Sequence, residues 1–232
     1  MKYKFLYIIT FVLSGFLLHS QEIKDKFLFK NDAKSEMGYI LKLPANQKKK
    51  FPLMIFLHGS GERGNDLEKV KSHSPFTYQN EIKEEIAILA PQCPENVWWD
   101  TKLVYELIMS TISKYNIDTT RIYITGLSMG GWGTWKLAIE HPELFAAVVP
   151  VCAPADRFMI INAGKLNMPI RIYHGALDDI VPPSESIDMH QKLKKENKQS
   201  ELFIFSNDNH NSWDSTYSNP ELYKWILSQQ KK

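Results

Sequence analysis

The chain has 232 residues, of which 44% are hydrophobic and 23% charged, so it can bury a core and is neither disordered nor fibrous. Its length suits one α/β domain. The 28 Lys and Arg residues include Lys2 and Lys4 of an N-terminal leader, and the other 26 balance the 26 Asp and Glu residues. This balance argues against nucleic acid or an anionic membrane as the main partner.

Residues 1–20 have the features of a signal peptide. Lys2 and Lys4 form a basic start, and the 14 residues of 5–18 are an apolar stretch that is short for a membrane span. Ser20 is small enough to precede a cleavage site, although Leu18 suits the third position before the cut poorly. The alternative is an uncleaved N-terminal anchor. We expect an exported protein, periplasmic or secreted, that has no stable membrane association after cleavage and folds as one domain over residues 21–232.

The mature chain alternates strand and helix patterns. Two short strands, Lys26–Phe29 and Gly38–Leu43, are joined by a polar turn. Apolar runs typical of strands covered on both faces follow at residues 51–57, 86–90, 121–125, 146–151, 170–173 and 202–205. Helix patterns occupy residues 102–115, 129–140, 184–197 with Ser184 as N-cap, and 220–229 with Asn219 as cap. This order predicts a mostly parallel central sheet flanked by helices, with the first two strands antiparallel at one edge.

Cys93 and Cys152 are the two cysteines of the chain. Both follow strand patterns, so their ends could meet at one edge of the sheet, and an exported protein can keep a disulfide. Two cysteines do not make a disulfide framework, and their spacing does not resemble a metal site. The sequence therefore does not decide whether Cys93 and Cys152 form a disulfide, and no metal is expected.

A serine lies between a strand pattern and a helix pattern in ITGLSMGGWGTW, residues 124–135. Ser128 has Gly126 and Gly130 two residues away on either side, which fits G-x-S-x-G. Small neighbours let the chain turn sharply there, and the turn raises the serine hydroxyl above the carboxyl end of the sheet at a helix N-terminus. Ser128 is the candidate nucleophile, and the alternative is a glycine turn with a bystander serine. Gly131 and Gly133 are expected to let the new helix pack closely.

A nucleophilic serine needs a histidine base, which a carboxylate orients. In this architecture the order along the chain is Ser, then Asp or Glu, then His. His210 follows the last strand on a polar loop at the carboxyl end of the sheet, from which it can reach Ser128. The other downstream histidines are expected on helices or in a structural position at a strand end: His141, His190 and His174.

The acid is expected on the loop after the penultimate strand, which reads HGALDDIVP. This loop offers Asp178 and Asp179, and Asp156 after an earlier strand is a third candidate. The residues alone do not separate Asp178 from Asp179.

The oxyanion of a tetrahedral intermediate needs two N–H donors, one from the residue after the nucleophile and one from a loop after an earlier strand. Met129 supplies the first. Residues 58–61, His-Gly-Ser-Gly, follow the first buried strand, and Ser60 N–H is the candidate for the second. The alternative for this loop is a plain turn that ends the strand.

These segments together resemble the α/β-hydrolase superfamily. Within it, the chain is similar to small bacterial carboxylesterases grouped with dienelactone hydrolases, phospholipase/carboxylesterases, and polyhydroxybutyrate-depolymerase-like or feruloyl esterases. The resemblance implies the α/β-hydrolase fold and implies that Asp178 is the acid, with Asp179 second, because Asp178 stands in H-G-x-x-D with Val181-Pro182 after it. The segments that carry it are LHGSGERGND (57–66), APQCPENVWWD (90–100), RIYITGLSMGGWGTW (121–135), HPELFAAVVPVCA (141–153), IRIYHGALDDIVP (170–182) and NHNSWD (209–214).

About 18 residues separate the strands at 146–151 and 170–173, which is too short for a sizeable lid and predicts an open cleft. Trp98 and Trp99 should lie near that cleft and could stack on an aromatic acyl group or a sugar ring. The alternative is one ring in the core and the other at the rim. Glu62 is a further candidate for substrate contact. Tryptophans expected in the core or packed on the histidine loop are Trp132, Trp135 and Trp213.

We therefore expect an exported serine hydrolase that cleaves carboxylic esters through an acyl-enzyme, without a cofactor or a metal. Its substrate is expected to be a small-molecule or polysaccharide-linked ester, with acetyl or feruloyl esters of plant polysaccharides as a guess. The alternatives are a serine peptidase of the same fold and a non-catalytic binding protein on this scaffold. The sequence does not indicate an oligomeric state.

Overall fold

A computed structural model describes residues 20–231 except 30, 31 and 197, and it does not describe the side chains of residues 32–35. Apart from Ser20, the predicted signal peptide lies outside the described residues. Within them, no helix is both long enough and apolar enough to cross a membrane.

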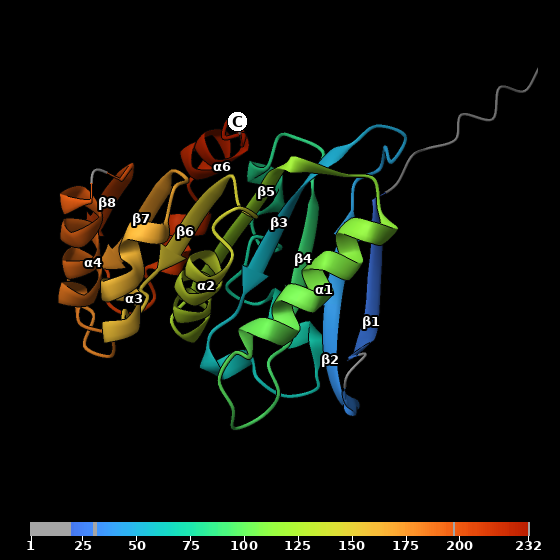
Figure 1. Cartoon of the computed structure of the whole chain (residues 1–232), viewed down its shortest axis with the longest axis horizontal. Helices are drawn as coiled ribbons and strands as arrows, with labels where there is room; N and C mark the ends of the chain where they lie inside the picture. The colour runs from blue at the N-terminus through green and yellow to red at the C-terminus, as the bar shows by residue number, and fades with distance from the viewer. Residues whose placement is uncertain (1–19, 30–31, 197, 232) are drawn as a thin grey trace, which may run out of the picture.

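The described strands form one twisted sheet in the order β1-β2-β4-β3-β5-β6-β7-β8, with β1 and β2 at one edge and β8 at the other (Figure 1). The β1–β2 and β2–β4 pairs are antiparallel and all other pairs are parallel, so the predicted antiparallel edge in a mostly parallel sheet is confirmed. The strands are β1 (Gln21–Phe29), β2 (Asp32–Leu43), β3 (Phe51–Leu57), β4 (Ala87–Pro91), β5 (Ile117–Leu127), β6 (Ala147–Val151), β7 (Ile170–Gly175) and β8 (Ser200–Phe205).

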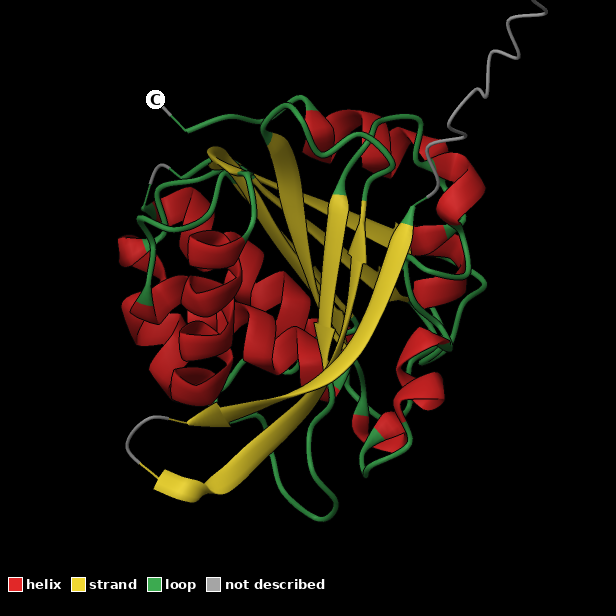
Figure 2. Cartoon of the chain, turned by 90° about the vertical axis from the view of Figure 1, so that its right-hand side faces the viewer, coloured by secondary structure: helices red, strands yellow, loops and turns green. Residues whose placement is uncertain are grey.

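Helices cover both faces of the sheet (Figure 2). Strand β3 shows why, because every one of its residues is buried and alternate side chains enter different cores. Leu53 and Ile55 join the core beneath α1 (Thr101–Lys114), α2 (Met129–Glu140), α3 (Arg157–Asn162) and α4 (Pro183–Lys195). Met54 and Phe56 join the core beneath α5 (Trp213–Tyr217) and α6 (Pro220–Leu227). The continuous apolar run in the sequence is thus explained by helices on both sides.

Side-chain caps define the start of several helices, α1 and α6 among them. The Asp100 carboxylate accepts the N–H groups of the first turn of α1, and Asn219 caps α6 as predicted. The prediction that Ser184 caps α4 is wrong, because the helix begins at Pro183 with Pro182 at the cap position. A proline suits the first helical position, where its missing N–H costs nothing. Helix α3 was not predicted from the sequence, since its six residues are too few to show a helical period.

The direction in which the strands are added to the sheet reverses between β3 and β5. After β3 the chain crosses to β4 on one side, and after β5 it crosses to β6 on the other side. Leu57 pairs with Gly126, so the loops that follow β3 and β5 leave the sheet side by side. Such a point at the carboxyl ends of parallel strands is where ligands of open α/β sheets bind.

Only residues 152–169 separate β6 from β7, and they form α3 and a single 3-10 turn. The described chain therefore has no large lid over this end of the sheet, as the sequence predicted. Cys93 and Cys152 are both free and buried, so the structure has no bridge between them. Burial raises the pKa of Cys93 to about 11.

A buried histidine ties the carboxyl ends of β3 and β4 together. His58 is 0% exposed, and its Nε2 accepts the Cys93 N–H at 3.0 Å. Its Nδ1 therefore carries the proton and donates to Gly59 O at 2.6 Å, so the ring is neutral. Trp99 packs its ring on His58 at 4.7 Å between centroids and donates Nε1–H to His58 O at 3.2 Å. Burial is the main cause that lowers the pKa of His58 to about 4.

This lowered pKa predicts a loss of stability in acid. Between about pH 6.5 and about pH 4 the unfolded chain binds a proton at His58 and the native state does not, so the free energy of unfolding should fall as pH falls, by about 3 kcal/mol from this residue. His58→Gln can still accept from Cys93 N–H but cannot titrate. It should be less stable than the wild type at neutral pH and should lose less stability over this range. Urea unfolding of both proteins at several pH values in this range measures how steeply the free energy of unfolding falls with pH. An equal dependence on pH in the two proteins would contradict the prediction.

Candidate active site

Ser128 is the single residue between β5 and α2, and its backbone is strained. Its φ of 52° and ψ of −119° fall in a region that non-glycine residues rarely adopt. Two hydrogen bonds hold this turn: Ser128 N–H donates to Val151 O at 2.9 Å, and Trp132 N–H donates to Ser128 O at 3.0 Å. The end of β6 and the first turn of α2 therefore maintain the strain that exposes the serine hydroxyl.

The glycines around Ser128 are required by the close approach of backbones. A Cβ on Gly126 would lie 2.7 Å from Leu57 O, and a Cβ on Gly130 would overlap the same oxygen. A Cβ on Gly131 would lie 2.6 Å from Ala153 Cβ. The predicted need for small neighbours is confirmed, and its physical cause is the carboxyl end of β3, against which α2 begins.

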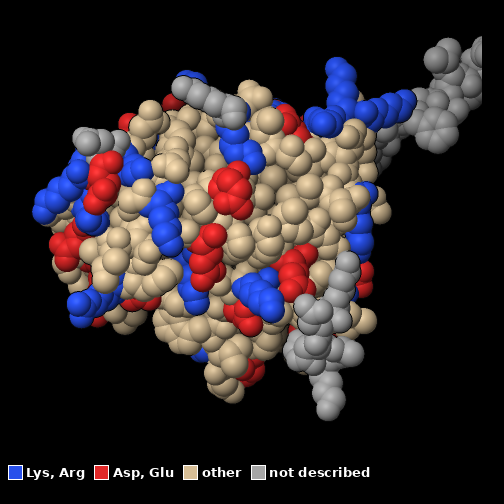
Figure 3. Space-filling view, viewed as in Figure 1, with Lys and Arg blue, Asp and Glu red and all other residues tan. Residues whose placement is uncertain are grey.

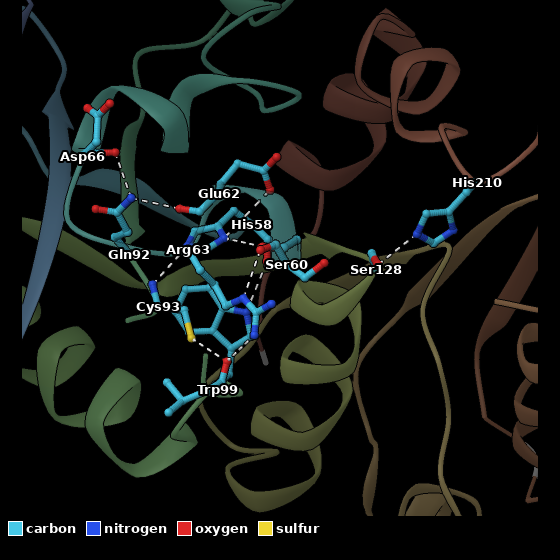
Figure 4. A network of polar contacts seen from close by, with 12 residues as sticks. His58, Ser60, Glu62, Arg63, Asp66, Gln92, Cys93, Trp99, Ser128 and His210 are labelled. Carbon is cyan, nitrogen blue, oxygen red and sulfur yellow. Dashed lines mark hydrogen bonds and ion pairs between the residues drawn. The ribbon is translucent and has the colours of Figure 1, made fainter. Parts of the chain in front are cut away.

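His210 and Asp178 complete a chain of hydrogen bonds that starts at Ser128. Ser128 Oγ lies 2.9 Å from His210 Nε2, and these two side chains point toward each other in Figure 4. His210 Nδ1 lies 2.8 Å from Asp178 Oδ2. Because a carboxylate only accepts, Nδ1 carries the proton and Nε2 is free to accept the proton of the Ser128 hydroxyl. The structure thus brings together the three residues that the sequence singled out, in the order of a nucleophile, a base and an orienting acid.

The loops after β7 and β8 are joined to each other, which sets the position of both side chains. Ala176 N–H donates to Phe205 O and Leu177 N–H donates to Asp208 O, each at 2.9 Å. A Cβ on Gly175 would overlap the carbonyl oxygens of the loop that leads to His210. The glycine of the H-G pair therefore lets the histidine loop lie directly on the end of β7.

The Asp178 side chain is fully buried and fully bonded. Its Oδ1 accepts the N–H groups of Ile180 at 3.0 Å and Val181 at 2.9 Å, while Oδ2 faces His210. Burial acts to raise the pKa of Asp178, but the hydrogen bonds from His210, Val181 and Ile180 outweigh it and hold the pKa below its ordinary value. Asp178 is therefore a carboxylate at neutral pH.

The two other candidate acids lie elsewhere. Asp179 is exposed. Asp156 caps α3 by accepting Met159 N–H at 3.0 Å, and it also accepts Trp132 Nε1–H at 3.1 Å.

The two expected oxyanion donors lie on neighbouring turns. Met129 is the first residue of α2, whose first N–H groups have no partner within the helix. Ser60 begins a 3-10 turn after β3, beside Ser128 in Figure 4. A Cβ on Gly59 would lie 3.7 Å from Ser128 Cβ, so this loop passes directly over the serine. Arg63 braces it by donating Nε–H to Ser60 O at 2.9 Å.

Glu62 lies in the same loop and is mostly buried, with 14% of its side chain exposed. Its Oε2 is 3.9 Å from His58 Nδ1 and has no hydrogen-bond partner among the described residues. Burial is the main cause that raises the pKa of Glu62. The position that a Cβ on Gly59 would take lies 3.3 Å from this oxygen and 3.7 Å from Ser128 Cβ, so the carboxyl group is near the serine.

The structure corrects the expected roles of the tryptophans. Trp99 is 2% exposed against His58, so it has no surface for a substrate and the prediction that it binds one is wrong. Trp98 is 56% exposed and packs its edge on Trp132 at 5.3 Å between centroids. Trp132 is half-buried rather than in the core, unlike Trp135, which is fully buried as expected. The sequence reasoning placed Trp132 in the core and so missed its contact with Trp98.

Trp213 packs edge-on against the His210 ring at 5.4 Å, as expected for the histidine loop. No group of three or more His, Cys, Asp or Glu side chains among the described residues is arranged to hold a metal ion. On the face shown in Figure 3, basic and acidic side chains are interspersed and do not form one large patch of a single sign.

Comparison with known proteins agrees with this geometry. A crystal structure of a thermostable esterase superposes with a TM-score of 0.80 and 32% identity over 90% of this chain and 63% of that chain. A bifunctional acetylxylan esterase/xylanase of Neocallimastix patriciarum is 28% identical over 164 residues, which cover 65% of this chain and 23% of that protein. A poly(3-hydroxyoctanoate) depolymerase of Pseudomonas fluorescens is 25% identical over 167 residues, 57% of this chain and 58% of that protein.

This chain thus spans less than two thirds of the length of each of these proteins. The family model of the dienelactone hydrolase family matches residues 77–218, which is more than half of the chain and includes Ser128, Asp178 and His210. The eight-stranded sheet, the turn at Ser128 and this match agree, and the protein belongs to the dienelactone hydrolase family, with an α/β-hydrolase fold.

Proposed function

We propose that this protein is an exported serine hydrolase that cleaves carboxylic esters, with Ser128 as nucleophile, His210 as base and Asp178 as orienting acid. The observation that carries the proposal is the pair of hydrogen bonds of 2.9 Å and 2.8 Å that link these three side chains. Membership of the dienelactone hydrolase family supports it. We further propose that residues 1–20 are a signal peptide and that residues 21–232 are the catalytic domain.

In the proposed first step, Ser128 Oγ attacks the ester carbonyl and His210 Nε2 takes the hydroxyl proton. Asp178 keeps the Nδ1–H tautomer of His210 and stabilises the ring once it is charged. The N–H groups of Met129 and Ser60 hold the oxyanion of the tetrahedral intermediate. The intermediate then expels the alcohol, to which His210 returns the proton, and the acyl group remains on Ser128.

In the second step, a water molecule attacks the acyl carbonyl while His210 again takes a proton. Ser128 is then the leaving group and recovers its proton from His210, which releases the carboxylic acid. Both steps move only protons and an acyl group, so the proposed reaction uses no cofactor and no metal.

The substrate side of the site is proposed to hold a small-molecule or polysaccharide-linked ester, such as an acetyl or feruloyl ester. The exposed face of Trp98, braced by Trp132 one turn after Ser128, offers a flat apolar surface for an aromatic or sugar ring. Glu62 is proposed to contact a substrate hydroxyl through its unpaired oxygen. The acetylxylan esterase relative supports this class of substrate.

Ser128→Ala should nearly abolish the activity, because it removes the hydroxyl that lies 2.9 Å from His210 Nε2 and that is proposed to form the acyl-enzyme. With p-nitrophenyl acetate as substrate, kcat should fall by about 10⁴-fold or more. Ser184→Ala, which removes an exposed serine of α4, is the matched control and should turn over at the wild-type rate. A fluorophosphonate probe should label the wild type and the control but not Ser128→Ala. Turnover retained in Ser128→Ala would rule out this mechanism.

Trp98→Ala should weaken binding of ring-bearing esters and leave small esters unaffected. We expect KM for a feruloyl ester to rise about fivefold, as for the loss of one aromatic contact, with KM for an acetyl ester unchanged. Leu28→Ala is a suitable control, since it removes an exposed apolar side chain from the edge strand β1. An equal change for both esters would contradict the stacking role.

Faster cleavage of a matched amide than of the ester by the wild type would indicate a peptidase in place of an esterase.

A further inference from the structure

A second histidine contacts the acid of the site. His174 is the penultimate residue of β7 and is 0% exposed. Its Nε2 lies 3.1 Å from Asp178 Oδ2, the same oxygen that faces His210. The four-residue spacing in H-G-x-x-D thus brings the His174 ring directly onto the carboxylate. The sequence alone suggested only a structural residue at a strand end.

The hydrogen bonds of His174 determine where its proton lies. Nε2 faces two acceptors, Val181 O at 2.9 Å and Asp178 Oδ2 at 3.1 Å, so Nε2 must carry hydrogen. Nδ1 faces the Ser186 hydroxyl at 2.7 Å, which can donate to it. Burial is the main cause that lowers the pKa of His174, so its ring is neutral. His174 is therefore a fixed neutral donor rather than a second base.

We propose that His174 is a positioning residue, which orients the Asp178 carboxylate toward His210 by donating Nε2–H to the oxygen that they share. The proposal rests on the proposed role of Asp178 and His210. Ile180 and Val181 N–H bond Oδ1, and His210 Nδ1–H bonds Oδ2. His174 Nε2 donates to Val181 O at 2.9 Å and lies 3.1 Å from Oδ2, and we propose that it shares its hydrogen with that oxygen. The carboxylate is held in one rotamer, which keeps Oδ2 at 2.8 Å from His210 Nδ1.

The shared oxygen also predicts an electrostatic effect. A second donor on Oδ2 reduces the negative charge that Asp178 offers to His210. Without that donor, the carboxylate stabilises the protonated His210 ring more strongly, and the protonated ring cannot act as a base. The titratable groups that face Asp178 and His210 among the described residues are each other, His174 and the buried Cys152 thiol, which stays protonated because burial raises its pKa.

Three variants separate the Nε2–H donor from the bulk of the ring. His174→Leu removes the donor and keeps an apolar side chain. His174→Gln places an amide N–H near the position of Nε2, whereas the shorter His174→Asn reaches only the position of Nδ1. His190→Leu is the matched control, because it removes another histidine–serine hydrogen bond, to Ser200, away from Asp178.

With p-nitrophenyl acetate as substrate, His174→Leu and His174→Asn should lower kcat by about tenfold or more, with little change in KM because His174 touches no substrate. The acid limb of the pH–rate profile should move to higher pH in both. His174→Gln should recover kcat to within about threefold of the wild type and restore the profile. His190→Leu should change thermal stability without moving the profile. If His174→Leu does not fold, the contrast between the Gln and Asn variants carries the test.

A second measurement does not depend on turnover. The His210 Nδ1 proton, bound to Asp178, should give a downfield proton NMR signal whose titration moves to higher pH in His174→Leu or His174→Asn and returns in His174→Gln. An unchanged signal and pH profile in a folded Leu or Asn variant would overturn the proposal, as would a Gln variant as impaired as the Leu variant. A wild type that hydrolyses no ester but shows the NMR pattern would instead refute the proposed function and leave the role of His174 supported.

Discussion

The contact between the turn at Ser128 and the carboxyl end of β3 is the constraint on which the rest of the site depends. Gly126 and Gly130 both lie against Leu57 O, so the backbones of β3, β5 and α2 meet with no side chain between them. This approach fixes the strained backbone of Ser128, and it also brings the loop after β3 over the serine. The proposed nucleophile and the loop of proposed N–H donors are thereby positioned together by one packing arrangement, before any side chain of the site is considered.

A second close approach positions the other two residues. Gly175 lets the loop after β8 rest on the end of β7, and backbone hydrogen bonds join the two loops. The loops that carry Asp178 and His210 are therefore positioned against each other. Because the Asp178 side chain is buried and both of its oxygens are hydrogen-bonded, the proposed acid is held by main-chain N–H groups and by the His210 ring rather than by solvent. This preorganisation suits a group whose proposed role is to orient another.

Patterns with a clear physical cause were predicted well from the sequence. The bounds of α2, the antiparallel pair at the edge and most of the buried parallel strands follow from periodicity and from the glycine turn. The prediction that residues 202–205 are covered on both faces is wrong, because β8 is the edge strand of the sheet and Phe203 and Ile204 are exposed. The adjacent tryptophans show the limit of such reasoning, because neighbouring residues of an irregular loop have no fixed period. Trp99 faces inward because its ring packs on His58 and its Nε1–H bonds His58 O, contacts that form only after β3 and β4 pair. The start of α4 was misjudged by one residue for a local reason, since Pro183 can begin a helix.

The sequence by itself determined the class of fold, the serine at the turn and the order in which an acid and a histidine follow it. These features are local, because they depend on the residues that immediately flank each strand end. The tertiary structure decided which partners these residues share. His174 and Val181 are brought onto Asp178 by the fold of one loop, and Trp132 is brought beside Trp98 by the packing of α2 against a distant segment. The spacing places these residues close along the chain or on a helix, but only the folded loop and the packed helix turn their side chains toward one another.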